Sequence, residues 1–181
     1  MNKLLLFFVA AISLTACSSS DKNTEEKVLT QSQQTDCNGA YVKKYDFTSA
    51  DITNHVSLTG FAGVEVGNGS WTCENEAIID MPWETGSTAT ISMNVTPFVT
   101  NSHKIDVEVY IEDVLYEIWK FDSYFSETKN MFVKPSNVTD DVISLKFSIK
   151  TPKSPAELGL NSDVRKLGLF FEKITVYGFK E

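Results

Sequence analysis

The fold is decided by residues 150–178, KTPKSPAELGLNSDVRKLGLFFEKITVYG, where a loop rich in turn-forming residues leads into one strongly apolar segment. The apolar segment, 167–177, is rich in the β-branched and aromatic residues that favour strands, and we expect it to be the closing core strand. In the loop, Ser154 and Glu157 have the spacing of a helix capping box, with Pro155 at the first helical position. The pattern therefore predicts one short helical turn before the last strand.

The sequence upstream reads as short strands separated by polar turns. Alternation of apolar and polar residues is clearest at 105–111, and the Glu112-Asp113 pair that follows predicts a tight hairpin turn. The glycine-rich run 58–71 predicts further tight turns instead of a helix. The other segments with a strand pattern are 41–47, 76–81, 88–99, 115–121, 125–133 and 142–149. Together they predict an all-β fold, an antiparallel jelly-roll-like β-sandwich of about eight strands.

Length and composition limit the number of domains in the chain and the kinds of partner that it can bind. The chain has 181 residues, enough for one ordinary domain once a signal segment is subtracted. A hydrophobic content of 42% is sufficient for a core. The formal net charge of -8 argues against nucleic-acid binding, which depends on clustered Lys and Arg side chains that neutralise phosphates. We therefore expect a single folded domain and no nucleic-acid partner.

The N-terminal residues have the pattern of a signal sequence. Lys3 precedes an apolar run, 4–14, which is too short to span a bilayer comfortably as a permanent helix, and small residues precede Cys17. The motif LTAC at 14–17 resembles the lipobox of bacterial lipoproteins. This resemblance implies cleavage before Cys17, lipidation of Cys17 and a membrane anchor with several acyl chains, which are needed for stable attachment. The alternative is an ordinary secretory signal with a chance cysteine.

The residues after the cysteine bear on the membrane and the domain boundaries. In the Gram-negative sorting rule that accompanies lipoproteins, an aspartate directly after the lipidated cysteine retains the protein at the inner membrane. Residue 18 occupies that position and is a serine, which implies the outer membrane, on its periplasmic face or at the cell surface. The sequence from Ser18 to about Asp36 is polar and lacks aromatic residues, which predicts a flexible tether. The predicted parts are a signal peptide at 1–16, a lipidated cysteine and tether at 17–37, and a β-sandwich domain at 38–181.

Cys37 and Cys73 remain once Cys17 is lipidated. An even pair of cysteines in an oxidising compartment predicts a disulfide between them. Such a bond would tie the start of the domain to the loop near Trp71, and the chain-entropy model gives it a stabilisation of roughly 3 to 4 kcal/mol. Two free buried thiols are the alternative.

Two motifs resemble an accessory domain of envelope enzymes. The motif SPAELGLNSDVRKLGL at 154–169 resembles the C-terminal motif of a β-sandwich domain appended to bacterial membrane-anchored phosphoglycerol transferases and some envelope glycosyltransferases. The runs GFAGVE at 60–65 and GNGSW at 67–71 look like the upstream motif of the same domain. The resemblance implies an accessory sandwich domain in envelope glycan metabolism, without catalytic residues of its own.

The polar and aromatic residues of these two motif loops form the candidate glycan site. Where both loops meet at one end of the sandwich, a tryptophan can stack on a sugar face while carboxylates and a guanidinium bind hydroxyls or an anionic substituent. The candidates are Glu65, Trp71, Asn161, Asp163 and Arg165. The structural interpretation is that Asp163 and Arg165 only bridge the loops, and that Trp71 fills the edge of the core.

No other constellation indicates catalysis. His55 and His103 stand in polar, turn-like surroundings without metal-ligand or nucleophile spacing, so we expect solvated histidines, no metal site and no cofactor. The first hypothesis is a non-catalytic outer-membrane lipoprotein whose sandwich binds or positions an envelope or extracellular glycan. The alternative is a protein–protein interaction subunit of an envelope or secretion complex, and an envelope hydrolase or transferase is the third.

Overall fold

Ten strands and two short 3-10 helices make up residues 39–180, the part of the chain that this computed structural model describes. The strands are β1 (Ala40–Asp46), β2 (Ser57–Thr59), β3 (Ser70–Trp71), β4 (Glu76–Pro82), β5 (Ser87–Pro97), β6 (Ile105–Ile111), β7 (Val114–Phe121), β8 (Glu127–Val133), β9 (Val142–Ile149) and β10 (Leu169–Lys180). The 3-10 helices are η1 (Ala50–Asn54) and η2 (Pro135–Asn137). No helix within residues 39–180 is long and apolar enough to cross a membrane.

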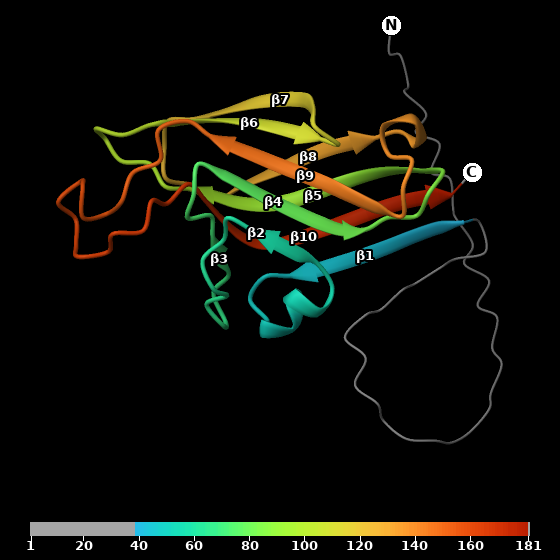
Figure 1. The fold of residues 1–181 in the computed structure, drawn as a ribbon, viewed down its shortest axis with the longest axis horizontal. Coiled ribbons are helices and arrows are strands. Elements are labelled where there is room, and N and C mark those ends of the chain that lie inside the picture. Colours follow the sequence, from blue (N-terminus) through green and yellow to red (C-terminus); the bar gives the residue numbers. More distant parts are fainter. Residues whose placement is uncertain (1–38, 181) are drawn as a thin grey trace, which may run out of the picture.

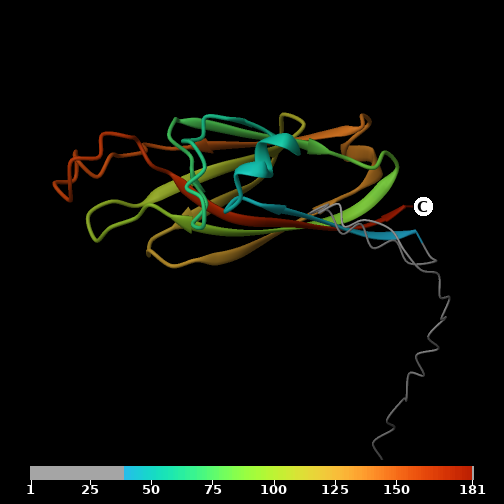
Figure 2. The ribbon, with the colours of Figure 1, turned by 90° about the horizontal axis from the view of Figure 1, so that it is seen from below.

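The strands form two antiparallel sheets that pack face to face (Figures 1 and 2). Sheet A has the strand order β1-β10-β5-β8, with β3 paired to the start of β10, and sheet B has the order β2-β4-β9-β6-β7. The arrangement confirms the predicted antiparallel β-sandwich. It also places the apolar C-terminal strand, β10, inside sheet A, between β1 and β5.

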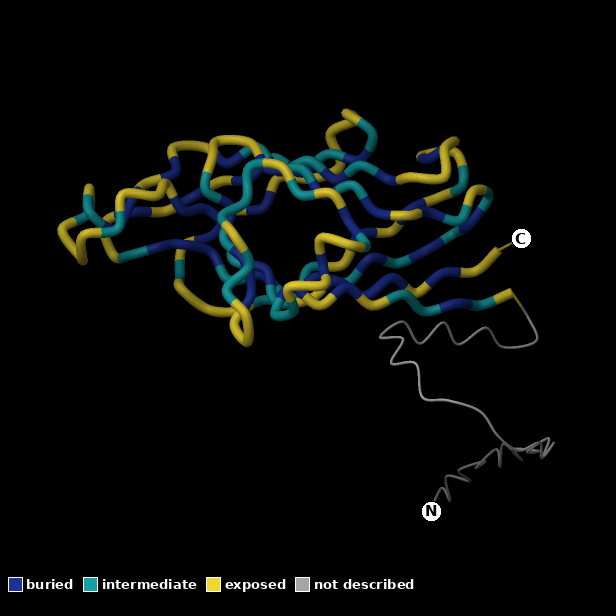
Figure 3. Tube along the Cα trace, turned by 60° about the horizontal axis from the view of Figure 1, so that its bottom comes forward, coloured by how far each residue is buried: buried dark blue, intermediate teal, exposed yellow. Residues whose placement is uncertain are grey.

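The core lies between the two sheets and follows the two-residue period of the strands. Buried and exposed positions alternate along most strands (Figure 3). On β10, Phe171, Ile174 and Val176 point inward and are no more than 2% exposed. Trp83 and Trp119 are both buried in this core. Burial of such large side chains removes most of their apolar surface from water and stabilises the sandwich.

The predicted strands and turns agree closely with the structure. The strand predicted at 142–149 coincides with β9, and the one predicted at 105–111 coincides with β6. Glu112 and Asp113 have φ angles of 49° and 61°, the left-handed conformation of a tight hairpin turn, so the predicted turn is confirmed. Strands β2 and β3 were not predicted, because three and two residues are too few to show a period.

The predicted capping box closes a single turn in the β9–β10 loop. The Ser154 backbone N–H donates to the Glu157 carboxylate at 2.8 Å, and the Glu157 N–H donates to the Ser154 hydroxyl at 3.0 Å. The Leu158 N–H completes the turn by donating to the Ser154 carbonyl at 3.2 Å. The loop that carries this turn projects from the end of the sandwich opposite the C-terminus (Figures 1 and 2).

The expectation of a solvated His103 is wrong. Its side chain is only 7% exposed and lies 6.3 Å from the ring of Phe98, measured between ring centroids. Burial lowers the pKa of the His103 imidazole, and the positive charge of Lys153 lowers it further. The neutral form is therefore favoured at this position, where the sequence around His103 had suggested an exposed polar turn.

The predicted disulfide lies partly outside the described residues. Cys73 is a free cysteine, and Cys37 lies outside the described residues. Gly39 accepts a hydrogen bond from Lys180 at the end of β10, whereas Thr72 donates to Leu169 at its beginning. These ends are about 35 Å apart at the rise of a β-strand. Cys37 itself is not described, so the bond between Cys37 and Cys73 stays a prediction.

Substitution of Gly60 tests whether the glycine-rich run 58–71 requires glycine for its backbone conformation. Its φ of 73° is left-handed, and a Cβ atom there would collide with the backbone carbonyl oxygen of Glu76. We expect Gly60→Ala to lower the free energy of unfolding by about 3 kcal/mol, from backbone strain and steric overlap together, as measured by urea denaturation. Gly63→Ala is the matched control, because nothing lies within 4 Å of its Cβ position. Equal effects of the two substitutions would contradict this account.

Candidate functional site

Arg165 joins the two motif loops at one end of the sandwich. Its Nε and Nη2 atoms lie 3.1 and 2.7 Å from the two carboxylate oxygens of Asp163, a paired geometry that favours tight binding. Its Nη1 atom lies 3.4 Å from Oε1 of Glu65, which belongs to the other motif loop. Three of the candidate residues, Glu65, Asp163 and Arg165, therefore come together. They bind one another at the surface, and we call them the Arg165 cluster.

The other two candidate residues, Asn161 and Trp71, make contacts within or beside the same two loops. The Asn161 side-chain oxygen accepts a hydrogen bond from the Asp163 backbone N–H at 2.8 Å, which shapes the loop next to Arg165. Trp71 packs against Phe170 with ring centroids 4.9 Å apart, and edge-on against Phe98 at 6.0 Å. These contacts match the structural interpretation, in which the residues bridge loops and cover the core edge. Their role in glycan binding stays a prediction.

The charges of the Arg165 cluster support one another. The Arg165 guanidinium holds the pKa of the Asp163 carboxyl below its ordinary value, and the Asp163 carboxylate raises the pKa of Arg165 in return. Both ions are thus stabilised in their charged forms. Because much of the hydrogen-bonding capacity of Arg165 is used inside the cluster, a ligand would have to compete with Asp163 for it.

A second candidate site lies on the outer face of sheet A and was not predicted. Three aromatic side chains on this face are about half exposed: Tyr177 at 53%, Phe132 at 50% and Phe179 at 46%. Tyr177 and Phe179 come from β10 and Phe132 comes from β8. We call these three residues the aromatic face. Large apolar side chains grouped on an exposed sheet mark interaction surfaces more often than isolated ones do.

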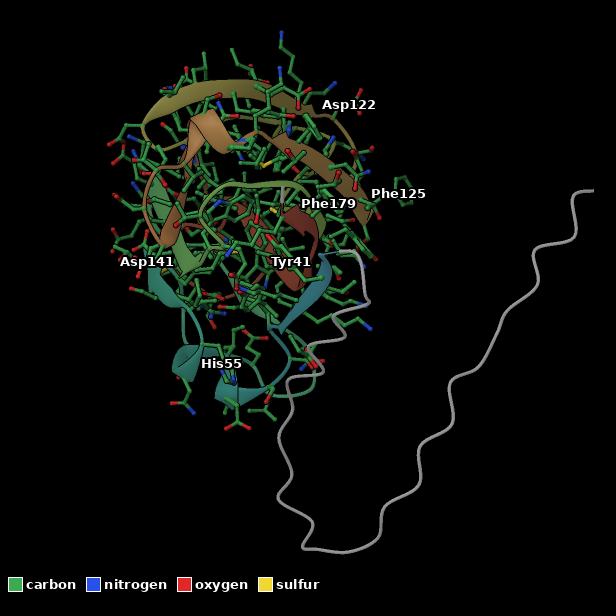
Figure 4. All side chains as sticks on the ribbon, turned by 90° about the vertical axis from the view of Figure 1, so that its right-hand side faces the viewer. Tyr41, His55, Asp122, Phe125, Asp141 and Phe179 are labelled. Carbon is green, nitrogen blue, oxygen red and sulfur yellow. The ribbon has the colours of Figure 1, made fainter. Side chains whose placement is uncertain are left out.

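Strand register brings the aromatic face together. Tyr177 pairs with Thr90 of β5, and Thr90 pairs with Phe132 on its other side. Phe179 pairs with Thr88, one step further along β5. Residues in register across a sheet point to the same side, so all five side chains stand on one surface. Figure 4 looks onto the end of the sandwich where Phe179 lies.

Small polar side chains fill the surface around these rings. The outward positions of β5 alternate strictly with its buried positions. Every one of them carries a hydroxyl or amide side chain: Thr88, Thr90, Ser92, Asn94 and Thr96. Thr128 and Asn130 continue this surface on β8. The surface thus combines aromatic rings with hydrogen-bonding groups that carry no charge.

The outer face of sheet B differs in kind. Lys150 binds Glu108 at 2.9 Å, and Tyr110 donates a hydrogen bond to Glu108 at 2.8 Å. Lys146 lies over the Tyr110 ring at 4.7 Å and forms an ion pair with Asp113. Charges and rings on this sheet are therefore paired with one another, whereas sheet A leaves its aromatic rings open to solvent.

A shallow, open depression lies between η1 and the edge of sheet B. It has a volume of about 520 Å³, and His55, Leu58 and Asp80 are among its lining residues. Within the described range no three His, Cys, Asp or Glu side chains lie close enough together to hold a metal ion. Neither the depression nor the aromatic face therefore contains such a metal-binding cluster among residues 39–180.

Sequence reasoning missed the aromatic face because its parts are distant in the chain. Residues 88–96 do show the polar alternation of a half-exposed strand. The sequence analysis predicts residues 167–177 as a core strand, and their mostly apolar character hides the outward direction of Tyr177. The alternation of β10 is interrupted by a bulge between Phe171 and Lys173, so a strict period of two from Phe171 would have put Tyr177 on the core side.

Comparisons with known proteins show a distant likeness of fold. No protein-family model matches the chain, and no curated protein matches it. A family 35 carbohydrate-binding module from Clostridium thermocellum shares 8% identity at a TM-score of 0.45, over 75% of this chain and 96% of that chain. The C-terminal CBM6 of LamC, a marine laminarinase from Zobellia galactanivorans, shares 9% at a TM-score of 0.42, over 75% and 98%. Latent PorU from Porphyromonas gingivalis shares 8% at 0.44, over 83% and 14%. Likenesses this distant carry no argument about a ligand.

The Arg165 cluster can be tested by titration. We expect Arg165→Ala to raise the pKa of the Asp163 carboxyl toward its ordinary value, because the guanidinium that favours the carboxylate is removed. The measurement is the NMR shift of that carboxyl carbon against pH.

The direction of the pH effect follows from the lowered pKa. Asp163 stabilises the loop above its unfolded-state pKa, and this contribution is lost as the pH falls through its lower folded-state pKa. Lys166→Ala, which removes a neighbouring charge without touching the ion pair, should leave the Asp163 titration unchanged. An unchanged titration in Arg165→Ala would contradict the coupling.

Proposed function

We propose that this protein is a non-catalytic outer-membrane lipoprotein whose β-sandwich binds an uncharged envelope or extracellular glycan on the aromatic face. The observation that carries the proposal is the set of half-exposed rings of Tyr177, Phe179 and Phe132 among hydroxyl and amide side chains. Sugar rings have apolar faces that stack on aromatic rings and hydroxyls that hydrogen-bond to polar side chains. The surface offers both kinds of contact side by side.

The chemistry of the surface favours a glycan over a lipid bilayer. Insertion into lipid would remove Thr88, Thr90 and Ser92 from water, and a hydroxyl without a compensating hydrogen bond costs about 1 to 3 kcal/mol on burial. A glycan supplies hydroxyls that replace the lost water. The centre of the face has no charged side chain, which favours an uncharged ligand.

The proposed membrane attachment depends on Cys17. Cys17 and Ser18 lie outside the described residues, so lipidation and outer-membrane location follow from the lipobox resemblance alone. The described chain enters the sandwich at Ala40, which pairs with Phe179 at the edge of the aromatic face. A tether from the membrane would therefore join the domain beside the proposed glycan site.

A protein partner is the second candidate, and the edge strand β7 favours it. β7 is the last strand of sheet B, and five consecutive residues, 114–118, are exposed. Val114, Leu115 and Ile118 are among them, at 68%, 50% and 46% exposure. Exposed apolar edge strands can pair with a strand of another protein. A stoichiometric partner cross-linked in cells at Ile118, with no glycan bound, would favour this second function.

The aromatic face can be tested with the whole chain purified in detergent. We expect it to be retained by an uncharged polysaccharide in affinity electrophoresis. Tyr177→Ala and Phe132→Ala should each weaken retention roughly tenfold, because a stacking platform is lost while the fold remains. Unfolding midpoints equal to that of the unsubstituted chain would show that folding is intact.

Two control variants locate the site. Phe125 is 72% exposed in the β7–β8 loop and lies at the margin of the molecule (Figure 4), so Phe125→Ala should bind normally. Arg165→Ala should also bind normally. Loss of binding in Arg165→Ala alone would move the site to the Arg165 cluster, and absence of binding to all glycans tested would refute the proposal.

Membrane attachment gives a separate prediction. We expect Cys17→Ala to abolish incorporation of labelled palmitate and to release the chain from the membrane fraction, because the acylated residue is removed. Cys73→Ala is the matched control and should still be labelled. Labelling that persists in Cys17→Ala would contradict the lipobox assignment.

A further inference from the structure

We infer that the ligand of the aromatic face is an extended, uncharged, β-linked polysaccharide chain that crosses the strands of sheet A. This inference rests on the proposed function and specifies its ligand. The path is one row of residues in register, which passes from the β1 edge of the sheet to the β8 edge. The row is Val42, Tyr177, Thr90 and Phe132, one residue from each of β1, β10, β5 and β8.

The spacing of the two rings in this row matches such a chain. Tyr177 and Phe132 are separated by the single strand β5, so their backbones lie about 10 Å apart. This distance is close to the repeat of one disaccharide in an extended β-linked chain. Such a chain turns the same ring face to the same side once in every disaccharide. Alternate sugar rings can therefore stack on Tyr177 and Phe132, while the ring between them lies over Thr90.

The distribution of charge also favours this direction. The row through Tyr177 contains no charged side chain, and neither does the adjoining row of Ala40, Phe179 and Thr88. Further along β10 the rows contain Lys44, and then Lys173 paired with Asp46. An uncharged corridor thus extends across the strands at the aromatic end of the sheet and stops where the charged rows begin.

A chain that followed β10 lengthwise would meet less favourable groups. Phe171 faces the core, so the next outward aromatic residue of β10 in that direction is Phe170, and its ring is already packed against Trp71 at 4.9 Å. The exposed Lys173 stands between Phe170 and Tyr177. The lengthwise path therefore has a charged side chain in the middle and an occupied ring at its far end, whereas the crosswise path has two open rings.

The test measures binding against the length of the ligand. The probes are β-1,4-linked oligosaccharides of glucose and of N-acetylglucosamine, from the disaccharide to the hexasaccharide, titrated calorimetrically into the whole chain in detergent. We expect binding to strengthen sharply at the trisaccharide, the first length that reaches both rings. Tyr177→Ala and Phe132→Ala should each weaken trisaccharide binding roughly tenfold and remove the step between the disaccharide and the trisaccharide.

Substitutions at Thr90 probe the centre of the path. Thr90→Lys should abolish trisaccharide binding because it places a long charged side chain under the middle ring, while Thr90→Ser should bind normally. A normal unfolding midpoint for both variants would exclude a folding defect. Full trisaccharide binding by Thr90→Lys would overturn the crosswise path.

The remaining outcomes separate this inference from the proposed function. Retention by an uncharged polysaccharide, with no step at the trisaccharide in either series, would overturn the crosswise path and leave glycan binding intact. Binding only to anionic or α-linked glycans would overturn the ligand class. Binding of the chain to phospholipid vesicles that is lost in Tyr177→Ala, without any glycan binding, would overturn both proposals. Phe125→Ala is the matched control in every arm.

Discussion

The double pairing of β10 is the constraint on which the rest of the structure depends. β10 pairs with β5 along its length on one side, and with β1 and the short β3 on the other. Because side chains alternate across a strand, this one register fixes both the buried side of sheet A and its open side. A bulge at Glu172 inserts one extra residue. Without it, the inward positions would continue from Phe171 to Lys173, and a lysine would face the core.

The strands were predictable where the alternation of apolar and polar residues runs over enough positions to be recognised. β6 and β9 alternate over their whole lengths, and the Glu112-Asp113 turn has the left-handed residues that a tight hairpin requires. β3 has only two residues and exists because β10 offers it a pairing edge, a dependence on distant residues that no local pattern contains.

The residues of the Arg165 cluster could be identified from the sequence, whereas those of the aromatic face could not. The sequence places Glu65, Asp163 and Arg165 in two motif loops, and the fold brings these three side chains together. Their side chains bind one another, and the sequence could not decide this because a charged pair and a charged site have the same composition. The aromatic face depends on the alignment of β8, β5 and β10, whose residues are far apart in the chain. Its members looked like ordinary strand residues, and only the register shows that their rings share one exposed surface.

The position of the aromatic face relates the two halves of the proposal. Phe179 pairs with Ala40, two residues inside the start of the predicted domain, so a membrane tether would enter beside the proposed glycan path. From Cys17 to Gly39 the covalent chain can span at most about 75 Å even when fully extended. A glycan on this face would thus be held within that distance of the membrane that carries the anchor. A ligand confined to this layer belongs to the envelope itself or to a polymer lying against it. The short reach of the tether and the chemistry of the aromatic face therefore both favour an envelope polymer as the ligand, because the face suits a long uncharged chain held flat across a sheet.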